Sequence, residues 1–204
     1  MNILYGLFPP SEGVITINGK SYSEMTPKKA IEAGIGMVHQ HFMLIEPLTV
    51  TENIILGYEN DTGLFLDRKS ARAKIKDLSD EYGLSIDPDS KVEDISVGMQ
   101  QRVEILKALY RGADILIFDE PTAVLTPQEI KEFIEIVKKL TTMDKSIIII
   151  THKLSEIKAM ADYCTIIRRG EFIDKLKVDE VDENILAEKM VGRNVSFNAV
   201  SYTH

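Results

Sequence analysis

The chain has 204 residues, of which 44% are hydrophobic and 27% charged, as is usual for one globular domain with or without a sub-domain. Its formal net charge of −8 argues against a broad nucleic-acid-binding surface, because phosphate backbones are bound by clustered Lys and Arg. The only cysteine, Cys164, excludes an internal disulfide and favours a reducing compartment. The longest aliphatic run, Ile147–Ile150, is far shorter than the ~20 residues of a membrane-spanning helix.

Two short stretches near the start of the chain are typical of strands: VITING at 14–19 and GIGMVHQ at 34–40. The region from 41 to 112 that follows has no long buried strand and several helix signals. Thr49 and Glu52 have the spacing of a capping box, which predicts a helix that begins there and ends at Gly57. A second helix is predicted by apolar residues at helical spacing followed by a glycine: Ala71, Ile75, Leu78, Tyr82 and Gly83.

A third helix is predicted in ISVGMQQRVEILKALYRG, at 95–112. Ser96 is a favourable N-cap, and Val103, Leu106 and Tyr110 follow at helical spacing. A Ser-x-Gly turn at the start of a helix exposes backbone N–H groups at the positive end of the helix dipole, where phosphate binds readily. The alternative interpretation is a capped helix without a ligand.

The next stretch, DILIFDE at 114–120, is apolar until Asp119 and Glu120. Open α/β sheets bind ligands at the carboxyl ends of their strands. Two adjacent carboxylates there suit a magnesium-bound nucleotide, because one can bind the metal and the other can orient or deprotonate the attacking water. The alternative is that the pair only caps a turn before Pro121, but the nearby Ser-x-Gly turn favours the nucleotide site.

The last third of the chain continues the alternation of helix and strand. Thr126 and Glu129 form a second capping-box pattern, with Pro127 at the first helical position. SIIIITH at 146–152 is another strand that is apolar until its end, and both such strands are expected to be buried on two faces. YCTIIRR and EFIDKLK, on either side of Gly170, predict a closing hairpin.

The alternation of these elements predicts an α/β fold with a mostly parallel sheet flanked by helices. We expect a partial core at 1–40, an inserted helical sub-domain at 41–112, the rest of the core at 113–192, and a tail or linker at 193–204.

In combination, these motifs resemble the ATPase subunit of an ABC transporter, which has a P-loop NTPase-like fold. Ser96–Arg102 resembles the signature loop of that family, usually written LSGGQ, and Ile115–Glu120 resembles its Walker B strand with the catalytic glutamate. His152 resembles the switch histidine, and Gln40 resembles the Q-loop glutamine. The four motifs occur in the order of the family, and the resemblance covers the chain from about residue 3 to 192.

Longer stretches resemble the first ATPase half of importers for simple sugars and nucleosides, in which two halves often share one polypeptide. They are YGLFPPSEGVITING, MVHQHFMLIEPLTVTENIILG, LKALYRGADILIFDEPTAVLTPQE and MVGR.

The resemblance implies a head-to-tail pair of ATPase domains that enclose two ATP molecules. Catalytic roles would then belong to Glu120, which polarises the water, to His152, which steadies the γ-phosphate, and to Gln40, which senses the nucleotide. Asp119 would hold Mg²⁺, with Gln40 also near the metal. The signature loop would contact the ATP of the opposite domain through Ser96, Gly98, Met99 and Gln100.

The implied partners are transmembrane permease subunits docked on the helical sub-domain, a second ATPase domain and, indirectly, a solute-binding protein. The implied location is the inner face of the cell membrane, and no nucleic acid is expected. Two other functions compete with this one. The chain could be a non-hydrolysing interaction or regulatory module that pairs with a complete ABC ATPase. A soluble ABC ATPase of translation or DNA repair is disfavoured, because it would need long basic arms or coiled-coil insertions.

The sequence departs from the family pattern in three places. The signature has Val97 for a glycine and Met99 for a glutamine, and Thr126 stands where the family usually has Asp. No Gly-x-x-x-x-Gly-Lys-Ser/Thr loop occurs anywhere in the 204 residues. We therefore expect an N-terminally truncated cassette with negligible ATP hydrolysis of its own. We also expect marginal stability, because a parallel sheet without its central strand has an exposed apolar edge.

Overall fold

The computed structural model describes residues 1–40, 42–57 and 68–192. The chain forms two compact units, Met1–Ile150 and Thr151–His204. The elements of the first unit are, in chain order, α1 (Asn2–Tyr5), β1 (Ile15–Ile17), β2 (Lys20–Tyr22), α2 (Pro27–Glu32), β3 (Ile35–Val38), α3 (Val50–Ile55), α4 (Arg68–Tyr82), the short 3₁₀ helix η1 (Val92–Asp94), α5 (Val97–Tyr110), β4 (Ile115–Asp119), α6 (Pro127–Thr142) and β5 (Ser146–Ile150).

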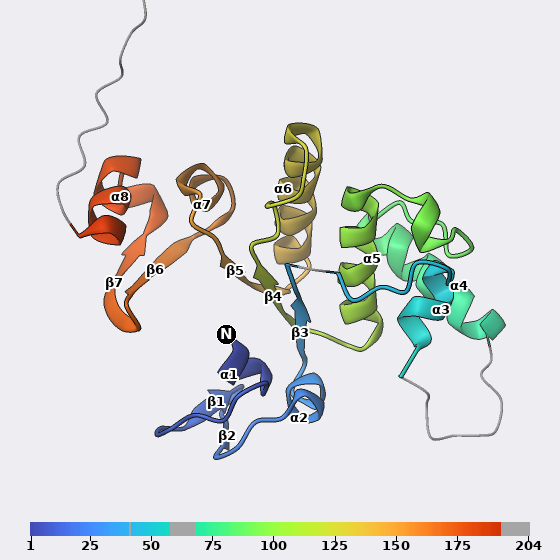
Figure 1. The fold of residues 1–204 in the computed structure, drawn as a ribbon, viewed down its shortest axis with the longest axis horizontal. Helices are drawn as coiled ribbons and strands as arrows, with labels where there is room; N and C mark the ends of the chain where they lie inside the picture. Colours follow the sequence, from blue (N-terminus) through green and yellow to red (C-terminus); the bar gives the residue numbers. More distant parts are fainter. Residues whose placement is uncertain (41, 58–67, 193–204) are drawn as a thin grey trace, which may run out of the picture. The chain divides into compact units, whose positions relative to one another are not determined.

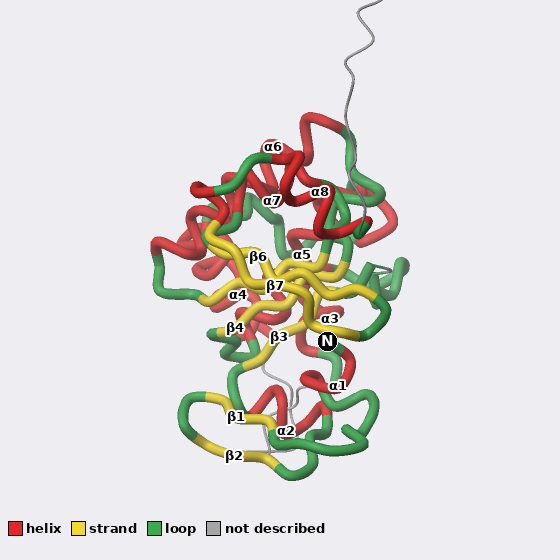
Figure 2. The backbone as a smooth tube through the Cα atoms, turned by 90° about the vertical axis from the view of Figure 1, so that its left-hand side faces the viewer, coloured by secondary structure: helices red, strands yellow, loops and turns green. Residues whose placement is uncertain are grey.

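The strand predicted at 14–19 is shorter than expected, because the chain turns back at Asn18 and Gly19 to form the antiparallel β1–β2 hairpin. Both turn residues have positive φ, 49° and 78°, as the two-residue turns that suit the twist of a hairpin require. Ile17 of this hairpin shares a buried cluster with residues of α2, β3 and β4, and Figure 2 shows the hairpin beside α2.

The core of the first unit is a three-stranded parallel sheet in the order β3-β4-β5 (Figure 1). β4 is central, and its residues Leu116, Ile117 and Phe118 are fully buried. The Phe118 ring meets Phe133 of α6 edge to face, with centroids 5.2 Å apart, a geometry that adds to the stabilisation from burial. The predicted α/β class with a parallel sheet is confirmed.

The expectation that SIIIITH is buried on both faces is wrong. The four isoleucines of β5, residues 147–150, are each partly exposed. Among the described residues β5 pairs with β4 alone, so it lies at an edge where fewer neighbours cover its side chains.

The chain between β3 and β4 is helical in its described parts. The capping box at Thr49 and Glu52 is present, but α3 ends at Ile55, two residues before the predicted stop at Gly57. α3, α4 and α5 pack against one another (Figure 1). The limits proposed for a helical sub-domain, 41–112, remain a prediction.

Gly36 of β3 allows α5 to approach the sheet closely. A Cβ atom at this position would lie 2.7 Å from the Cβ of Ala108 and 2.9 Å from the Cβ of Ala113. These distances are below van der Waals contact, so any larger residue must displace α5 from β3. The glycine therefore positions the helix that begins at Ser96 relative to the strand that leads to Gln40.

The second unit contains α7 (Leu154–Met160), β6 (Tyr163–Arg168), β7 (Glu171–Lys177), the 3₁₀ helix η2 (Val178–Glu180) and α8 (Glu183–Val191). The hairpin predicted around Gly170 is confirmed, because β6 and β7 pair antiparallel. Its small core is formed by Ile157, Ile166, Val178 and Leu186. The tail predicted at 193–204 lies outside the described residues. No helix in the described part of the chain is long and apolar enough to cross a bilayer.

Candidate functional site

Asp119 and Glu120 lie where the central strand β4 leaves the sheet. Asp119 is the last residue of β4 and pairs in register with Ile150 of β5. The backbone N–H of Glu120 donates to the Ile150 carbonyl at 2.9 Å. Glu120 has φ +48°, a left-handed conformation that is costly for a residue with a side chain and occurs in tight turns and at functional sites. Both carboxylates are half-buried.

Gln40 lies at the same edge of the sheet as the two acids. Val38, the last residue of β3, pairs in parallel with Phe118 of β4. Because parallel strands end at a common edge, Gln40 and Glu120, each two residues further on, leave the sheet together. Gln40 is exposed, and the sheet thus brings these two predicted site residues and Asp119 to one edge.

His152 follows the last residue of β5, Ile150, by two positions. It is exposed and belongs to the second unit. Its convergence with the acids and the glutamine therefore remains a prediction.

The predicted serine turn is present at the start of α5. Ser96 is the N-cap, and its Oγ accepts a hydrogen bond from the N–H of Met99 at 3.3 Å. Gly98 is buried, and its N–H donates to Oε1 of Glu129 at 3.1 Å. The Ser96 hydroxyl lies 3.2 Å from the same carboxylate oxygen. The N-terminus of α5 is therefore in contact with an anion, and that anion is a side chain of this protein.

The rest of the predicted signature loop makes structural contacts. The Gln100 amide donates to the carbonyls of Val92 and Ile95, at 3.3 and 3.4 Å. Gln101, which the sequence analysis did not single out, is only 2% exposed and donates to the Pro121 carbonyl at 2.7 Å. This bond ties the start of α5 to the residue that directly follows the acid pair.

Glu129 is the carboxylate at the centre of this region. Its Oε2 accepts from the N–H and the hydroxyl of Thr126, at 3.0 and 2.8 Å. These bonds from Thr126, followed by those from Gly98 and Ser96, hold the pKa of Glu129 below its ordinary value, although partial burial acts in the opposite direction. Only a capping role was predicted for Glu129, because nothing in the spacing indicates that α6 begins beside α5.

The segment after Gln40 is held by two buried polar residues of the helices. Glu104 of α5 accepts from the N–H of Met43 at 3.0 Å. Asn53 of α3, which is 2% exposed, accepts from the N–H of Ile45 at 2.7 Å. Its amide also donates to three carbonyls of the same loop, those of Ile45, Leu48 and Thr49. A polar residue on the buried side of a helix was the only sequence signal for either role.

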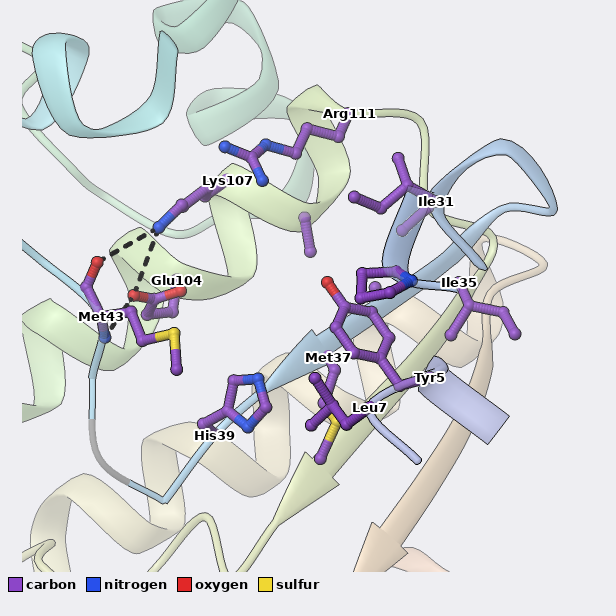
Figure 3. Close-up of a pocket in the computed structure, with 14 residues that line it drawn as sticks. Tyr5, Leu7, Ile31, Ile35, Met37, His39, Met43, Glu104, Lys107 and Arg111 are labelled. Carbon is purple, nitrogen blue, oxygen red and sulfur yellow. Dashed lines mark hydrogen bonds and ion pairs between the residues drawn. The ribbon is translucent and has the colours of Figure 1, made fainter. Parts of the chain in front are cut away.

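A cavity of about 180 Å³ lies between β3 and the second half of α5. Its lining includes Tyr5 and His39, whose rings meet edge to face with centroids 6.0 Å apart. Figure 3 shows the Tyr5 hydroxyl pointing into this space and two cations, Lys107 and Arg111, on the α5 side. Burial raises the pKa of Tyr5, partly offset by the charge of Arg111. This cavity, called the hollow below, is thus apolar at its base and charged at its rim, and it lies next to the segment that follows Gln40.

The acid pair can contribute to a metal site without forming a complete one. Among the described residues, no group of three or more His, Cys, Asp and Glu side chains is arranged to hold a metal. Mg²⁺ commonly takes one or two carboxylates and completes its shell with water and phosphate oxygens. Asp119 and Glu120 are donors of this kind at a half-exposed position. They therefore fit a metal that arrives with a nucleotide.

A parallel sheet with acids and a glutamine at its carboxyl edge, together with a serine-capped helix, defines an α/β protein of the ATP-binding cassette class. The family described as "ABC transporter" matches residues 1–123. The chain belongs to this family.

Two curated proteins and one solved structure are similar to this chain over most of its length. It is 61% identical over 197 residues to the nucleoside import ATP-binding protein NupA of Lactococcus lactis, an alignment that covers 97% of this chain and 39% of NupA. It is 43% identical over 225 residues to the glucose import ATP-binding protein TsgD13 of Haloferax volcanii, with 97% of this chain and 41% of that protein covered. The chain thus spans about two fifths of each relative.

The solved structure is the dimeric post-hydrolysis state of the ATP-binding cassette MJ0796 bound to ADP and Pi. The match has a TM-score of 0.69 and 26% identity, and it covers 87% of this chain and 78% of that one. It agrees with the predicted cassette fold.

Proposed function

We propose that the protein containing this chain binds and hydrolyses ATP to drive import of a nucleoside across the cytoplasmic membrane. The observation that carries the proposal is the 61% identity to a nucleoside import ATP-binding protein over 97% of this chain. A simple sugar is the second candidate solute, supported by the 43% identity to a glucose import protein.

The geometry at the carboxyl edge of the sheet supports the proposed division of roles. Asp119 ends the central strand and is placed to bind Mg²⁺, which neutralises phosphate charge when bound with ATP. Glu120 is held in a left-handed conformation and would polarise the attacking water. Gln40 leaves the neighbouring strand at the same edge and would lie near the metal. His152 is proposed to steady the γ-phosphate.

A second ATPase domain is proposed as the partner at the signature loop. Ser96 and Gly98 present a hydroxyl and an N–H at the positive end of α5, and Met99 and Gln100 complete the loop that would face the ATP of the opposite domain. The dimer of the MJ0796 cassette with ADP and Pi supports this arrangement.

Permease subunits are proposed as the partners on the helical side, and through them a solute-binding protein. The hollow between β3 and α5 supports this assignment, because it combines apolar base residues with cations at its rim. Met43 and Glu104 join the loop after Gln40 to α5 beside this hollow. A movement of Gln40 on nucleotide binding would therefore reach the surface that a permease contacts. The proposed location is the inner face of the cell membrane.

The 204 residues alone are proposed to be inactive. They contain no Gly-x-x-x-x-Gly-Lys-Ser/Thr loop, and that loop supplies most of the grip on the β- and γ-phosphates in P-loop enzymes. This feature also supports the competing function, a non-hydrolysing module that pairs with a complete ATPase. Micromolar binding of ATP·Mg²⁺ by the isolated chain would exclude that competing function.

The test of the proposed function is solute uptake by cells. The gene that encodes the chain is disrupted in its host, and uptake of a radiolabelled nucleoside and of radiolabelled glucose is measured. We expect loss of nucleoside uptake, restored by the wild-type gene and by the control Glu135→Gln, an exposed residue of α6, but not by Glu120→Gln. Unchanged uptake of both solutes in the disrupted strain would refute the proposal.

A further inference from the structure

Glu129 is a charged side chain with no role in the function proposed above. Its Oε1 lies 3.2 Å from the Ser96 hydroxyl and accepts from the N–H of Gly98 at 3.1 Å. These are the two donors that the signature loop would offer to a phosphate. The carboxylate therefore occupies, within the same chain, the position of the expected ligand.

The fit between Glu129 and the start of α5 is close. A Cβ atom on Gly98 would lie 2.6 Å from Oε1, 2.8 Å from Cδ and 2.9 Å from Cγ of Glu129. Only glycine leaves room for the carboxylate there. The same lack of a side chain would admit a phosphate, so the two anions compete for one space.

The carboxylate also accepts hydrogen bonds from Thr126, and these can hold it when its contacts with Ser96 and Gly98 are lost. Its Oε2 accepts from the N–H and the hydroxyl of Thr126, the N-cap of α6. Rotation of the Glu129 side chain can therefore release Ser96 and Gly98 while the capping box of α6 stays in place. The depressed pKa of Glu129 means that the group is charged at neutral pH, so it repels an incoming phosphate.

We propose that Glu129 is an autoinhibitory latch that closes the phosphate-binding face of the signature loop until a phosphate displaces it. This inference rests on the proposed function of Ser96 and Gly98 and adds regulation to it. The latch lowers the affinity of the loop for phosphate, and its displacement changes the contact between α5 and α6. Binding of nucleotide by a partner domain is thereby linked to the position of α6, the first helix after the acid pair.

The variant Glu129→Gln removes the negative charge of the side chain and keeps its shape. Glutamine serves as well as glutamate at this position of a capping box, so α6 keeps its N-terminus and the protein keeps its fold. The neutral amide no longer repels an anion. The matched control is Glu135→Gln, which removes the same charge from an exposed position of the same helix, about 9 Å further along its axis.

The experiment is a titration of the chain with inorganic phosphate at pH 7 and constant ionic strength, followed by NMR of ¹⁵N-glycine. The Gly98 amide signal is assigned by its absence in Gly98→Ala. We expect Glu129→Gln to bind phosphate at Gly98 with a Kd at least about tenfold lower than the wild type, as loss of one charge at contact distance predicts. Glu135→Gln should bind like the wild type, and overlaid spectra outside the site establish that all variants are folded.

Equal affinity of the wild type and Glu129→Gln would overturn the latch and leave the phosphate role of Ser96 and Gly98 intact. Equal tightening in Glu129→Gln and Glu135→Gln would also overturn it, because the effect would then come from net charge. No phosphate shift at Gly98 in any variant would remove both the latch and the phosphate role of the loop. The uptake assay with Glu120→Gln is independent of this loop, so a failure of the transport function is recognised separately.

Discussion

The substitution Asn53→Ala tests how the loop after Gln40 is held. Asn53 is 2% exposed and makes hydrogen bonds with three residues of this loop, Ile45, Leu48 and Thr49. Each of the three carbonyls keeps another donor when Asn53 is truncated: the N–H groups of Leu48, Val92 and Asn53 itself. In the described part of the chain, only the N–H of Ile45 loses its recorded partner.

The loss of stability expected for Asn53→Ala follows from these hydrogen bonds. The two shortest bonds, 2.7 Å from the N–H of Ile45 and 3.0 Å to its carbonyl, contribute about 1 kcal/mol each. The N–H left without its partner in a partly buried loop adds about 1 kcal/mol. Asn53→Ala should therefore lower the free energy of unfolding by about 3 kcal/mol.

The assay is urea unfolding of the chain followed by far-UV circular dichroism, together with hydrogen exchange of the Ile45 amide. Glu46→Ala is the control, because Glu46 is exposed in the same loop and should change stability by less than about 0.5 kcal/mol. If Asn53→Ala also changes stability by less than about 0.5 kcal/mol, and Ile45 exchanges at the wild-type rate, then the hydrogen bonds of Asn53 do not hold this loop.

Three further predictions concern packing, pH and nucleotide. Gly36→Ala should destabilise the protein by about 2 kcal/mol in urea unfolding, because its Cβ would lie 2.7 Å from that of Ala108; an unchanged midpoint contradicts the close packing of α5. Glu129 has a lowered pKa in the folded chain, so its contribution to stability is present above its ordinary pKa of 4.5 and is lost as the pH falls through the lower folded value. The stability difference between wild type and Glu129→Gln should therefore shrink below that pH, and a constant difference from pH 7 to 3 would count against these contacts. The isolated chain should show no rise in melting temperature with ATP·Mg²⁺, and a clear rise would show that it binds nucleotide without the phosphate loop.

Local chemistry made much of the fold predictable. Thr49 with Glu52, and Thr126 with Glu129, are capping boxes in the structure as their spacing indicated. The apolar run of β4 is the central buried strand. These features depend on neighbours within a few residues, and a sequence displays such neighbours directly.

The turn between β1 and β2 was not predicted, although Asn18 and Gly19 are a local signal for a two-residue hairpin turn. The other features that were missed depend on contacts between distant segments. The half-exposure of β5 could not be read from its isoleucines, because burial depends on which strands lie beside it. The bonds from Glu129 to the start of α5 join residues more than 30 positions apart, and only the packing of α6 beside α5 creates them.

We propose that Gln40, Asp119, Glu120 and His152 surround one nucleotide-bound metal. Oxidative cleavage tests it most directly: the natural protein that contains this chain is loaded with ATP and Fe²⁺ in place of Mg²⁺, treated with ascorbate and peroxide, and its fragments are mapped by mass spectrometry. We expect backbone cuts beside residue 40, at 119–120 and beside 152, all suppressed by excess ATP·Mg²⁺. Cuts at only one of these places, or scattered cuts that ATP·Mg²⁺ does not suppress, would contradict it.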